Sequence, residues 1–182
     1  MREFQRPHPE FSACGLNCGL CPRYYTAGDS RCPGCAGEGF FAKHPTCGIL
    51  SCCIRKNIDG CYQCEAYPCA KYDGADRWDS FITHKNRFRD LLQAKEAGAA
   101  PAVLSEKMSL LRRLLEQWND GRRKSFYCTA VNLLSAEGTA AVLDRLEHEV
   151  PPQTPKERAA LAVRLLEAQA QLECVDIKLR KK

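Results

Sequence analysis

The pattern of apolar and polar positions changes near residue 75. From about residue 76 to the end, Leu, Ala and aromatic residues recur every three or four positions among Arg, Lys and Glu. Such spacing predicts amphipathic helices. Before that point Cys, Gly, Pro and aromatic residues dominate, and little helical periodicity is present. The pattern therefore predicts two unlike parts, residues 1–75 and residues 76–182, packed against each other as one body.

The second part predicts four helices. Their approximate ranges are 77–94, 102–118, 122–134 with a continuation through 139–149, and a last helix that starts after residue 154. Gly98 and Pro101 separate the first two helices, and Gly138 is expected to break the third. Pro151 and Pro152 are expected to end it. This half of the chain is therefore predicted to be helical.

The apolar faces of these helices define the candidate core. The first face consists of Trp78, Phe81, Ile82, Phe88, Leu91 and Leu92, the second of Leu104, Met108, Leu111, Leu114, Leu115 and Trp118, and the last of Leu161, Leu165, Leu166 and Leu172. The last helix has the clearest start, because Thr154, Pro155 and Glu157 match a capping box with Pro at the first helical position. After it, apolar and charged residues alternate over 175–180, which predicts a short strand before a basic tail.

Composition and charge exclude several classes of protein. Charged residues make up 27% of the 182 residues and apolar ones 45%, which is typical of a globular chain rather than a disordered one. No apolar stretch approaches the ~20 residues that cross a bilayer, so no membrane partner is expected. The N-terminal sequence MREFQRPHPE lacks the apolar region of a secretory signal, which favours a cytoplasmic location.

The 13 cysteines are the unusual component. Their number is odd, and an oxidising compartment is not expected for this chain, so disulfides are disfavoured. Eleven of them lie between Cys14 and Cys69. Ten of these eleven form the candidate metal-ligand set: Cys14, Cys18, Cys21, Cys32, Cys35, Cys47, Cys52, Cys61, Cys64 and Cys69.

The spacing of these thiols suits metal coordination. Three CxxC pairs are present, at 18–21, 32–35 and 61–64. Two thiolates at that spacing reach one tetrahedral ion from a single tight turn, and a closed site takes four ligands. The set therefore predicts two zinc ions, with grouping in chain order favoured over an interleaved arrangement. The expected fold is mainly α with a small metal-stabilised, irregular Cys-rich N-terminal module, because a structural zinc supplies on the order of 10 kcal/mol to a segment with a thin core.

Several residues near the cluster have two interpretations. Cys53 follows Cys52 directly, so it is expected to pack as a small apolar group rather than as a ligand. His44, three residues before Cys47, is either a further zinc ligand or a solvated loop residue, and the second is favoured because thiols already suffice. The remaining histidines are expected on the surface: His8, His84 and His148.

A resemblance to a known family rests on three segments, CGLNCGLCP, CPGC and CYQCEAYPC. They resemble an uncharacterised prokaryotic family of cysteine-rich proteins that is catalogued as a domain of unknown function and described as zinc-binding. The resemblance covers roughly residues 12–72, and the later segments GRRKSFYCTAVNLL and IKLRKK resemble an extension carried by some members. It implies metal binding but brings no reaction, substrate or partner.

An iron-sulfur cluster is the alternative to zinc. The triplet Cys14, Cys18 and Cys21 has the CxxxCxxC spacing that resembles the cluster motif of radical S-adenosylmethionine enzymes, and Pro22 follows it as in ferredoxin-type motifs. The chain is short for the barrel of those enzymes, and its second part lacks alternating strands and helices. A simpler iron-sulfur protein with a redox or enzymatic role stays open, because thiolates suit both metals.

The basic residues suggest a possible nucleic-acid or phosphate ligand. The net charge is +5, and two clusters stand out: Arg122, Arg123 and Lys124 at an expected helix start, and Lys178, Arg180, Lys181 and Lys182 at the end. Free N–H groups at a helix start favour an anion. The favoured interpretation is that these side chains are simply solvated, because a nucleic-acid footprint is normally more basic.

The remaining thiols and the absence of enzyme motifs favour a non-catalytic role. Cys128 follows the basic cluster and is either reactive or, as favoured, a buried small residue, and Cys174 is interpreted in the same way. The sequence contains no phosphate-binding glycine loop, no GxSxG and no HExxH. Shells made only of Cys are typical of structural zinc sites. The sequence therefore favours a zinc-binding scaffold or interaction protein, with a protein partner, over an enzyme.

Overall fold

The computed structural model describes residues 4–45, 47–149 and 154–181, and these residues contain helices but no β-strand. The α-helices are α1 Phe40–Lys43, α2 Gly48–Lys56, α3 Arg87–Ala97, α4 Val103–Gln117, α5 Lys124–Leu133, α6 Ala136–Glu149 and α7 Pro155–Leu172. Single 3-10 turns lie at Cys18–Leu20, Gly28–Ser30, Cys61–Gln63 and Ala70–Tyr72. The expectation of a mainly α fold is confirmed for the described part of the chain.

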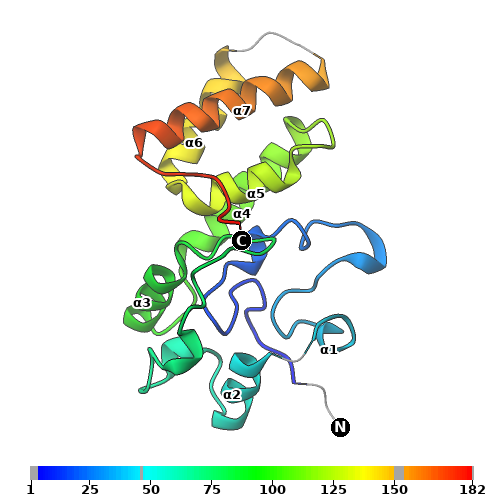
Figure 1. The fold of residues 1–182 in the computed structure, drawn as a ribbon. Coiled ribbons are helices and arrows are strands. Elements are labelled where there is room, and N and C mark those ends of the chain that lie inside the picture. Colours follow the sequence, from blue (N-terminus) through cyan, green and yellow to red (C-terminus); the bar gives the residue numbers. More distant parts are fainter. Residues whose placement is uncertain (1–3, 46, 150–153, 182) are drawn as a thin grey trace.

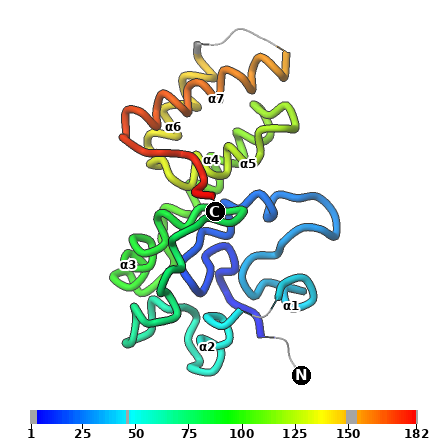
Figure 2. The backbone as a smooth tube through the Cα atoms, viewed as in Figure 1, coloured from blue at the N-terminus to red at the C-terminus, as the bar shows by residue number. Residues whose placement is uncertain are grey.

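The helices divide between two bodies stacked end to end (Figure 1). The lower body holds the N-terminal segment with α1, α2 and α3, and most of its path is loop, as the tube in Figure 2 shows. The upper body holds α4 to α7, in which α4 packs on α5 and α6, and α6 packs on α7. The 3-10 turn at Cys18–Leu20 contacts both α4 and α5, so it joins the two bodies. The C-terminal segment returns from α7 to the junction (Figure 1).

The core of the upper body comes from the expected apolar spacing. On α4, Leu104, Leu111 and Leu114 are buried, as the pattern predicted. Helix α5 is buried on nearly all sides, and its Tyr127 hydroxyl donates to the Trp118 carbonyl oxygen at 2.6 Å. These residues belong to one continuous apolar cluster together with Val142, Leu143, Leu146, Ala162 and Leu166.

Helix α7 begins with the capping box that the sequence predicted. The Glu157 N–H donates to Thr154 Oγ1 at 3.3 Å, and the Thr154 N–H donates to Glu157 Oε2 at 3.0 Å. Its buried face consists of Ala159, Ala162, Leu166 and Ala170. Three of these four are small, and their spacing of three and four residues forms one stripe. The expected core residue Leu172 is 79% exposed, because it ends the helix beyond that stripe.

The first expected helix begins ten residues later than predicted, at Arg87 rather than 77. The segment before it is held by other hydrogen bonds: the Asp79 N–H donates to the Arg180 carbonyl oxygen, and the His84 N–H donates to Asp79 Oδ1. These bonds replace the helical ladder. Trp78 and Phe81, expected on its inner face, are exposed on this loop, and Phe88 and Leu92 are exposed because α3 buries the face that carries Arg87, Asp90, Leu91 and Ala94 instead. His84, expected on the surface, is half-buried, and its Nδ1 lies 3.0 Å from the Ala75 carbonyl oxygen.

The strand expected at 175–180 is absent, because no second strand lies beside it in the described ranges. Instead the segment is fixed by side chains: Lys85 Nζ donates to the Asp176 carbonyl oxygen at 2.6 Å, and the Arg180 N–H donates to Asp79 Oδ2 at 2.6 Å. Hydrogen bonds from the Lys85 ammonium group and to the Asp79 carboxylate thus fix this segment, instead of the hydrogen bonds of a β-sheet.

The break in the third expected helix lies at Leu134–Ser135 rather than at Gly138. Ser135 Oγ accepts the Gly138 N–H at 2.9 Å, which makes Ser135 a cap for α6 and places Gly138 inside that helix. Three residues used in the expectations lie outside the described residues: Pro151, Pro152 and Lys182. No helix in the described ranges is long and apolar enough to span a bilayer.

Candidate metal centre

Two of the three CxxC pairs form the tight turns that their spacing predicted. The Cys21 N–H donates to the Cys18 carbonyl oxygen, and the Cys64 N–H donates to the Cys61 carbonyl oxygen, both at 3.0 Å. Each turn closes one 3-10 helix and brings its two cysteines together. In the middle pair Gly34 has φ +88°, and a Cβ there would lie 2.4 Å from the Pro9 carbonyl oxygen, so only glycine fits.

The N-terminal segment draws the CxxC pairs together. The Cys35 N–H donates to the Pro9 carbonyl oxygen at 2.7 Å, and the Cys61 N–H donates to the Ala13 carbonyl oxygen at 2.9 Å. Arg6 adds a buried ion pair with Asp59, since its Nε lies 2.9 Å from Oδ1 and its Nη2 lies 3.0 Å from Oδ2. Segments far apart in sequence therefore converge around residues 6–13.

One set of thiols, the first thiol group, gathers around Cys18 and Cys35. It consists of Cys14, Cys18, Cys21, Cys32, Cys35 and Cys47. Burial raises the pKa of Cys18 well above its ordinary value, and nearby Cys35 and Cys14 raise it further. Burial likewise raises the pKa of Cys35 to about 11, with Cys14 and Cys47 adding to the shift. Arg6 lowers the pKa of Cys35 but does not outweigh burial, so Cys18 and Cys35 are held in the neutral form.

His44 belongs beside the first thiol group, although the sequence favoured a solvated loop residue. Its Nε2 lies 3.1 Å from Cys32 Sγ, and its ring stacks on Phe40 with 4.4 Å between centroids. Burial lowers its pKa, as does the charge of Arg23. An imidazole kept neutral beside a thiol is a candidate metal ligand. The sequence signal was its position three residues before Cys47.

The remaining thiols of this region form the second thiol group, which lies beside α2 and the turn at Cys61–Gln63. It consists of Cys52, Cys53, Cys61, Cys64 and Cys69. The Cys53 and Cys61 sulfurs are 3.9 Å apart, and Lys56 Nζ donates to Cys64 Sγ at 3.2 Å. The hydrogen bond from Cys53 lowers the pKa of Cys61 to about 6 against the effect of burial, helped by Tyr72, Lys56 and Arg6.

The second thiol group thus has cationic neighbours that sequence reasoning missed. Lys56 and Arg6 both favour the thiolate of Cys61. Lys56 follows Cys52 by four residues on one helix, a spacing that could have revealed it. Arg6 is 47 residues before Cys53 and carried no local signal. Cys53 itself is buried in a small apolar cluster with Leu50 and Phe40, which agrees with the expected packing role.

The donor set suits a thiolate-binding metal by its chemistry, and two of its CxxC pairs have the turn geometry of metal sites. The sulfurs are mostly half-buried, two pairs sit on tight turns, and an imidazole adjoins one of them. Within the described residues, no three Cys, His, Asp or Glu side chains converge closely enough to surround one ion. Which of the ten expected ligands would share an ion therefore stays a prediction. Cys47 is placed with the first group because it raises the pKa of Cys35.

The two remaining cysteines differ from each other. Cys128 is buried, and burial raises its pKa to about 12, with Cys21 adding to the shift, so it is a small packed residue as favoured from the sequence. Cys174, expected to be similar, is exposed. It follows α7 with φ +54°, which turns the chain away from the helix axis.

The basic cluster at the start of α5 lies partly on the surface. Arg122 and Arg123 are exposed, whereas Lys124 lines a cavity of about 450 Å³ together with Arg31 and Arg112. The aromatic rings of Tyr24 and Tyr25 line the same cavity. Positive charge is thus concentrated with aromatic surface at this cavity.

Comparison with known proteins adds one family. Residues 10–74 match the model of a family described as "Protein of unknown function (DUF3795)". The match covers the segments that carried the resemblance, and it supports an uncharacterised family with many cysteines. Neither a curated protein nor a solved structure matched the chain.

Proposed function

We propose that residues 10–74 bind two zinc ions through closed thiolate sites and that the protein is a non-catalytic scaffold or interaction protein. The ligands of these two four-ligand sites, eight at most, are drawn from Cys14, Cys18, Cys21, Cys32, Cys35, Cys47, Cys52, Cys61, Cys64 and Cys69. The observation that carries the proposal is the gathering of eleven thiols, two CxxC pairs of them on tight turns, into two neighbouring groups.

Electrostatics supports a cation in both groups. Several thiols of the first group are desolvated and surrounded by other thiols, so their ionisation is unfavourable without added positive charge. A zinc ion supplies that charge and releases the thiol protons on binding. Arg6 interacts with Cys35 of the first group as well as with Cys61 of the second, but Lys56 lies beside the second group alone. We expect the second group to bind metal at lower pH than the first.

His44 supports zinc rather than an iron-sulfur cluster at the first group. Three thiolates and one imidazole form a common structural zinc shell, whereas most clusters are held by four cysteines. His44 lies at hydrogen-bond distance from Cys32. A four-ligand shell that includes His44 uses three of the six thiols of this group, so the other three stay outside it.

Metal analysis tests the proposal. Protein purified without oxygen and without added metal should contain about two zinc per chain and should be colourless. The Cys61→Ser variant should lose about one ion, and the matched Cys174→Ser variant, at an exposed cysteine outside both groups, should keep two. Brown protein with iron and sulfide would contradict the zinc proposal and support the iron-sulfur alternative.

A phosphate-bearing ligand is a second candidate, supported by the cavity that Lys124 shares with Arg31 and Arg112. Three cations beside Tyr24 are suited to a phosphate and an adjoining base. A fluorescent single-stranded oligonucleotide should bind with an affinity that falls steeply with salt. Lys124→Ala should weaken this binding more than Arg122→Ala, and equal effects would contradict the role of the cavity.

A further inference from the structure

A buried polar network joins the two bodies beside the first thiol group and contains no thiol itself. Asn17 Nδ2 donates to Asp90 Oδ2 at 2.7 Å and to Asn132 Oδ1 at 3.0 Å. Asn86 Nδ2 donates to the same two oxygens, at 2.9 and 3.0 Å. All four residues are buried, and they come from the Cys-rich segment, the loop before α3, α3 itself and α5. Polar groups are costly to bury, so such a convergence needs a reason beyond packing.

Lys107 of α4 reaches the same network. It is 6% exposed, and its Nζ donates to the Asn132 carbonyl oxygen at 3.1 Å. Burial lowers its pKa to about 8, with a smaller contribution from Arg89, while Asp90 and two Glu carboxylates oppose the shift. A lysine with this pKa is about one tenth neutral at pH 7, against roughly one part in two thousand for an ordinary lysine.

A cavity of about 290 Å³ opens beside Lys107 and Asn17. Asn17 Oδ1 lies buried at this cavity and accepts no hydrogen bond from any described residue. The orientation of the amide is fixed, because its Nδ2 faces two acceptors and an exchange of the two atoms would set oxygen against oxygen. The residues that line the cavity therefore include one amine and one unused acceptor. Its size suits only a small molecule.

The charged groups around the cavity determine which kind of molecule fits. Arg89 and Asp90 face it from α3, Glu137 from α6, and Glu173 from the end of α7. With Lys107 neutral, three carboxylates stand against one guanidinium. An anionic ligand is disfavoured by this excess of negative charge. The unused acceptor of Asn17 requires a donor such as a hydroxyl group.

We propose that this cavity binds a small neutral hydroxycarbonyl compound and that Lys107 condenses with its carbonyl group to form a Schiff base. The nitrogen lone pair of Nζ attacks the carbonyl carbon, and the carbonyl oxygen leaves as water with both amine protons, so that C=N replaces C=O. A hydroxyl group of the ligand donates to Asn17 Oδ1. This activity is separate from metal binding and goes beyond the proposed scaffold role.

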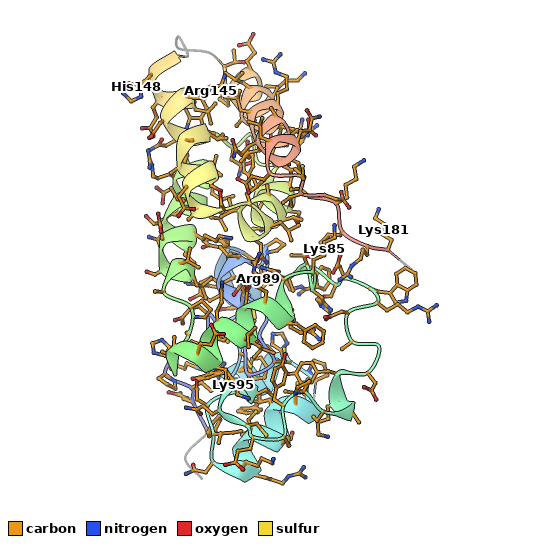
Figure 3. The ribbon with its side chains drawn as sticks, turned by 90° about the vertical axis from the view of Figure 1, so that its left-hand side faces the viewer. Lys85, Arg89, Lys95, Arg145, His148 and Lys181 are labelled. Carbon is orange, nitrogen blue, oxygen red and sulfur yellow. The ribbon has the colours of Figure 1, made fainter. Side chains whose placement is uncertain are left out.

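Reductive trapping tests the proposal on the intact, metal-loaded protein. Glycolaldehyde is the probe, cyanoborohydride reduces any imine, and peptide mapping by mass spectrometry locates the added hydroxyethyl group. Lys95, exposed near the other end of α3 from Arg89, is the internal reference (Figure 3). We expect modification at Lys107 to be at least about tenfold faster than at Lys95, because its neutral fraction is larger. Equal or slower modification at Lys107 overturns the proposal.

A second probe and a pair of variants separate binding from mere reactivity. Glyoxylate, in which a carboxylate replaces the hydroxymethyl group, should show a smaller preference for Lys107, and an equal or larger preference would contradict the charge argument. Asn17→Asp removes the preference of glycolaldehyde for Lys107 over Lys95 by adding a fourth carboxylate, whereas Lys181→Arg, at an exposed lysine that does not line the cavity, leaves it unchanged. Circular dichroism and zinc content show that each variant is folded. A folded Asn17→Asp protein that keeps the preference contradicts the part assigned to Asn17.

Discussion

The two bodies of this molecule are ordered by different means. In the upper body, residues of α4 to α7 form one continuous apolar cluster in which Leu111, Leu143 and Leu166 are fully buried. The lower body shares this cluster through Phe11, Leu20, Tyr62, Tyr72 and Leu91, while its own separate cluster around Leu50 and Phe40 is much smaller and includes Cys35 and Cys53. Apolar burial contributes roughly 25 cal/mol per Å², so the upper body can be stable without a cross-link.

The comparison shows where a metal would matter. Turns such as Cys18–Leu20 have few hydrogen bonds of their own and gain little from helix formation. Small cores of this kind normally need metal ions or disulfides. A zinc ion would therefore contribute more to the stability of the lower body than to that of the upper body, even though both belong to one chain.

The largest expected effect is that of metal removal. Treatment with a strong chelator under reducing conditions should unfold residues 10–74, because on the order of 10 kcal/mol of metal-binding free energy is lost. Hydrogen exchange measured by mass spectrometry should show loss of protection there and retained protection in α4 to α7. Loss of protection in both bodies at the same chelator concentration would contradict the conclusion that metal stabilises mainly the lower body.

The next effect concerns the buried ion pair of the lower body. Arg6→Ala should lower the opening free energy of residues 10–74 by roughly 3–5 kcal/mol, because it leaves Asp59 partly buried without its cation. The opening free energy from hydrogen exchange in residues 10–74 measures this cost. The matched control is Arg113→Ala, whose partner Glu147 is one-third exposed in the upper body. It should cost at most about 1 kcal/mol, and similar costs for the two variants would contradict the prediction.

A substitution that creates a cavity in the upper body tests the same comparison from that body. Leu143→Ala removes a fully buried side chain from the apolar cluster and should lower the free energy of unfolding by about 2–5 kcal/mol. Urea denaturation followed by helical circular dichroism measures the loss. Zinc content should not change. A variant that released zinc would show that the upper body supports the metal sites.

The smallest effect lies at the junction, where Asp79 binds Arg180. Burial raises the pKa of Asp79, but hydrogen bonds from Arg180 and the His84 N–H outweigh it and lower the pKa to about 2. A lowered carboxyl pKa stabilises the folded state above its ordinary value near ~3.9, and this contribution is lost only as the pH falls toward 2. Asp79→Asn should therefore cost about 1 kcal/mol equally at pH 7 and pH 5 in urea denaturation. A cost that shrinks over this interval would contradict the assigned pKa.

Local signals were the ones that the sequence predicted correctly. Helix α4 followed its leucine spacing, α7 followed its capping box, and two CxxC pairs formed turns. Each of these depends on residues within a few positions of one another. The burial of Cys128 was also predicted correctly, from the apolar residues beside it.

Contacts between distant segments were the ones that the sequence could not provide. Residues 77–86 have helical spacing, yet Arg180, about 100 positions later, binds Asp79 and holds the segment as a loop. The apolar face of α7 uses alanines that a search for leucines passes over. At the candidate site, Arg6 lies beside the second thiol group only after folding, and the nearness of Lys107 to Asn17 depends on three separate contacts to Asn132 and Asp90.

Asn17 stands one position before Cys18, and its side chain is part of the wall of the Lys107 cavity. Any event at Cys18 that displaces Asn17 is expected to change the affinity of the cavity for its proposed ligand. Thermodynamic linkage then requires the converse: an occupant of the cavity changes the affinity of the thiols for metal by the same factor. For the proposed metal and the proposed cavity ligand, the amide side chain of this single residue would make the two occupancies mutually dependent, so that each would report on the other.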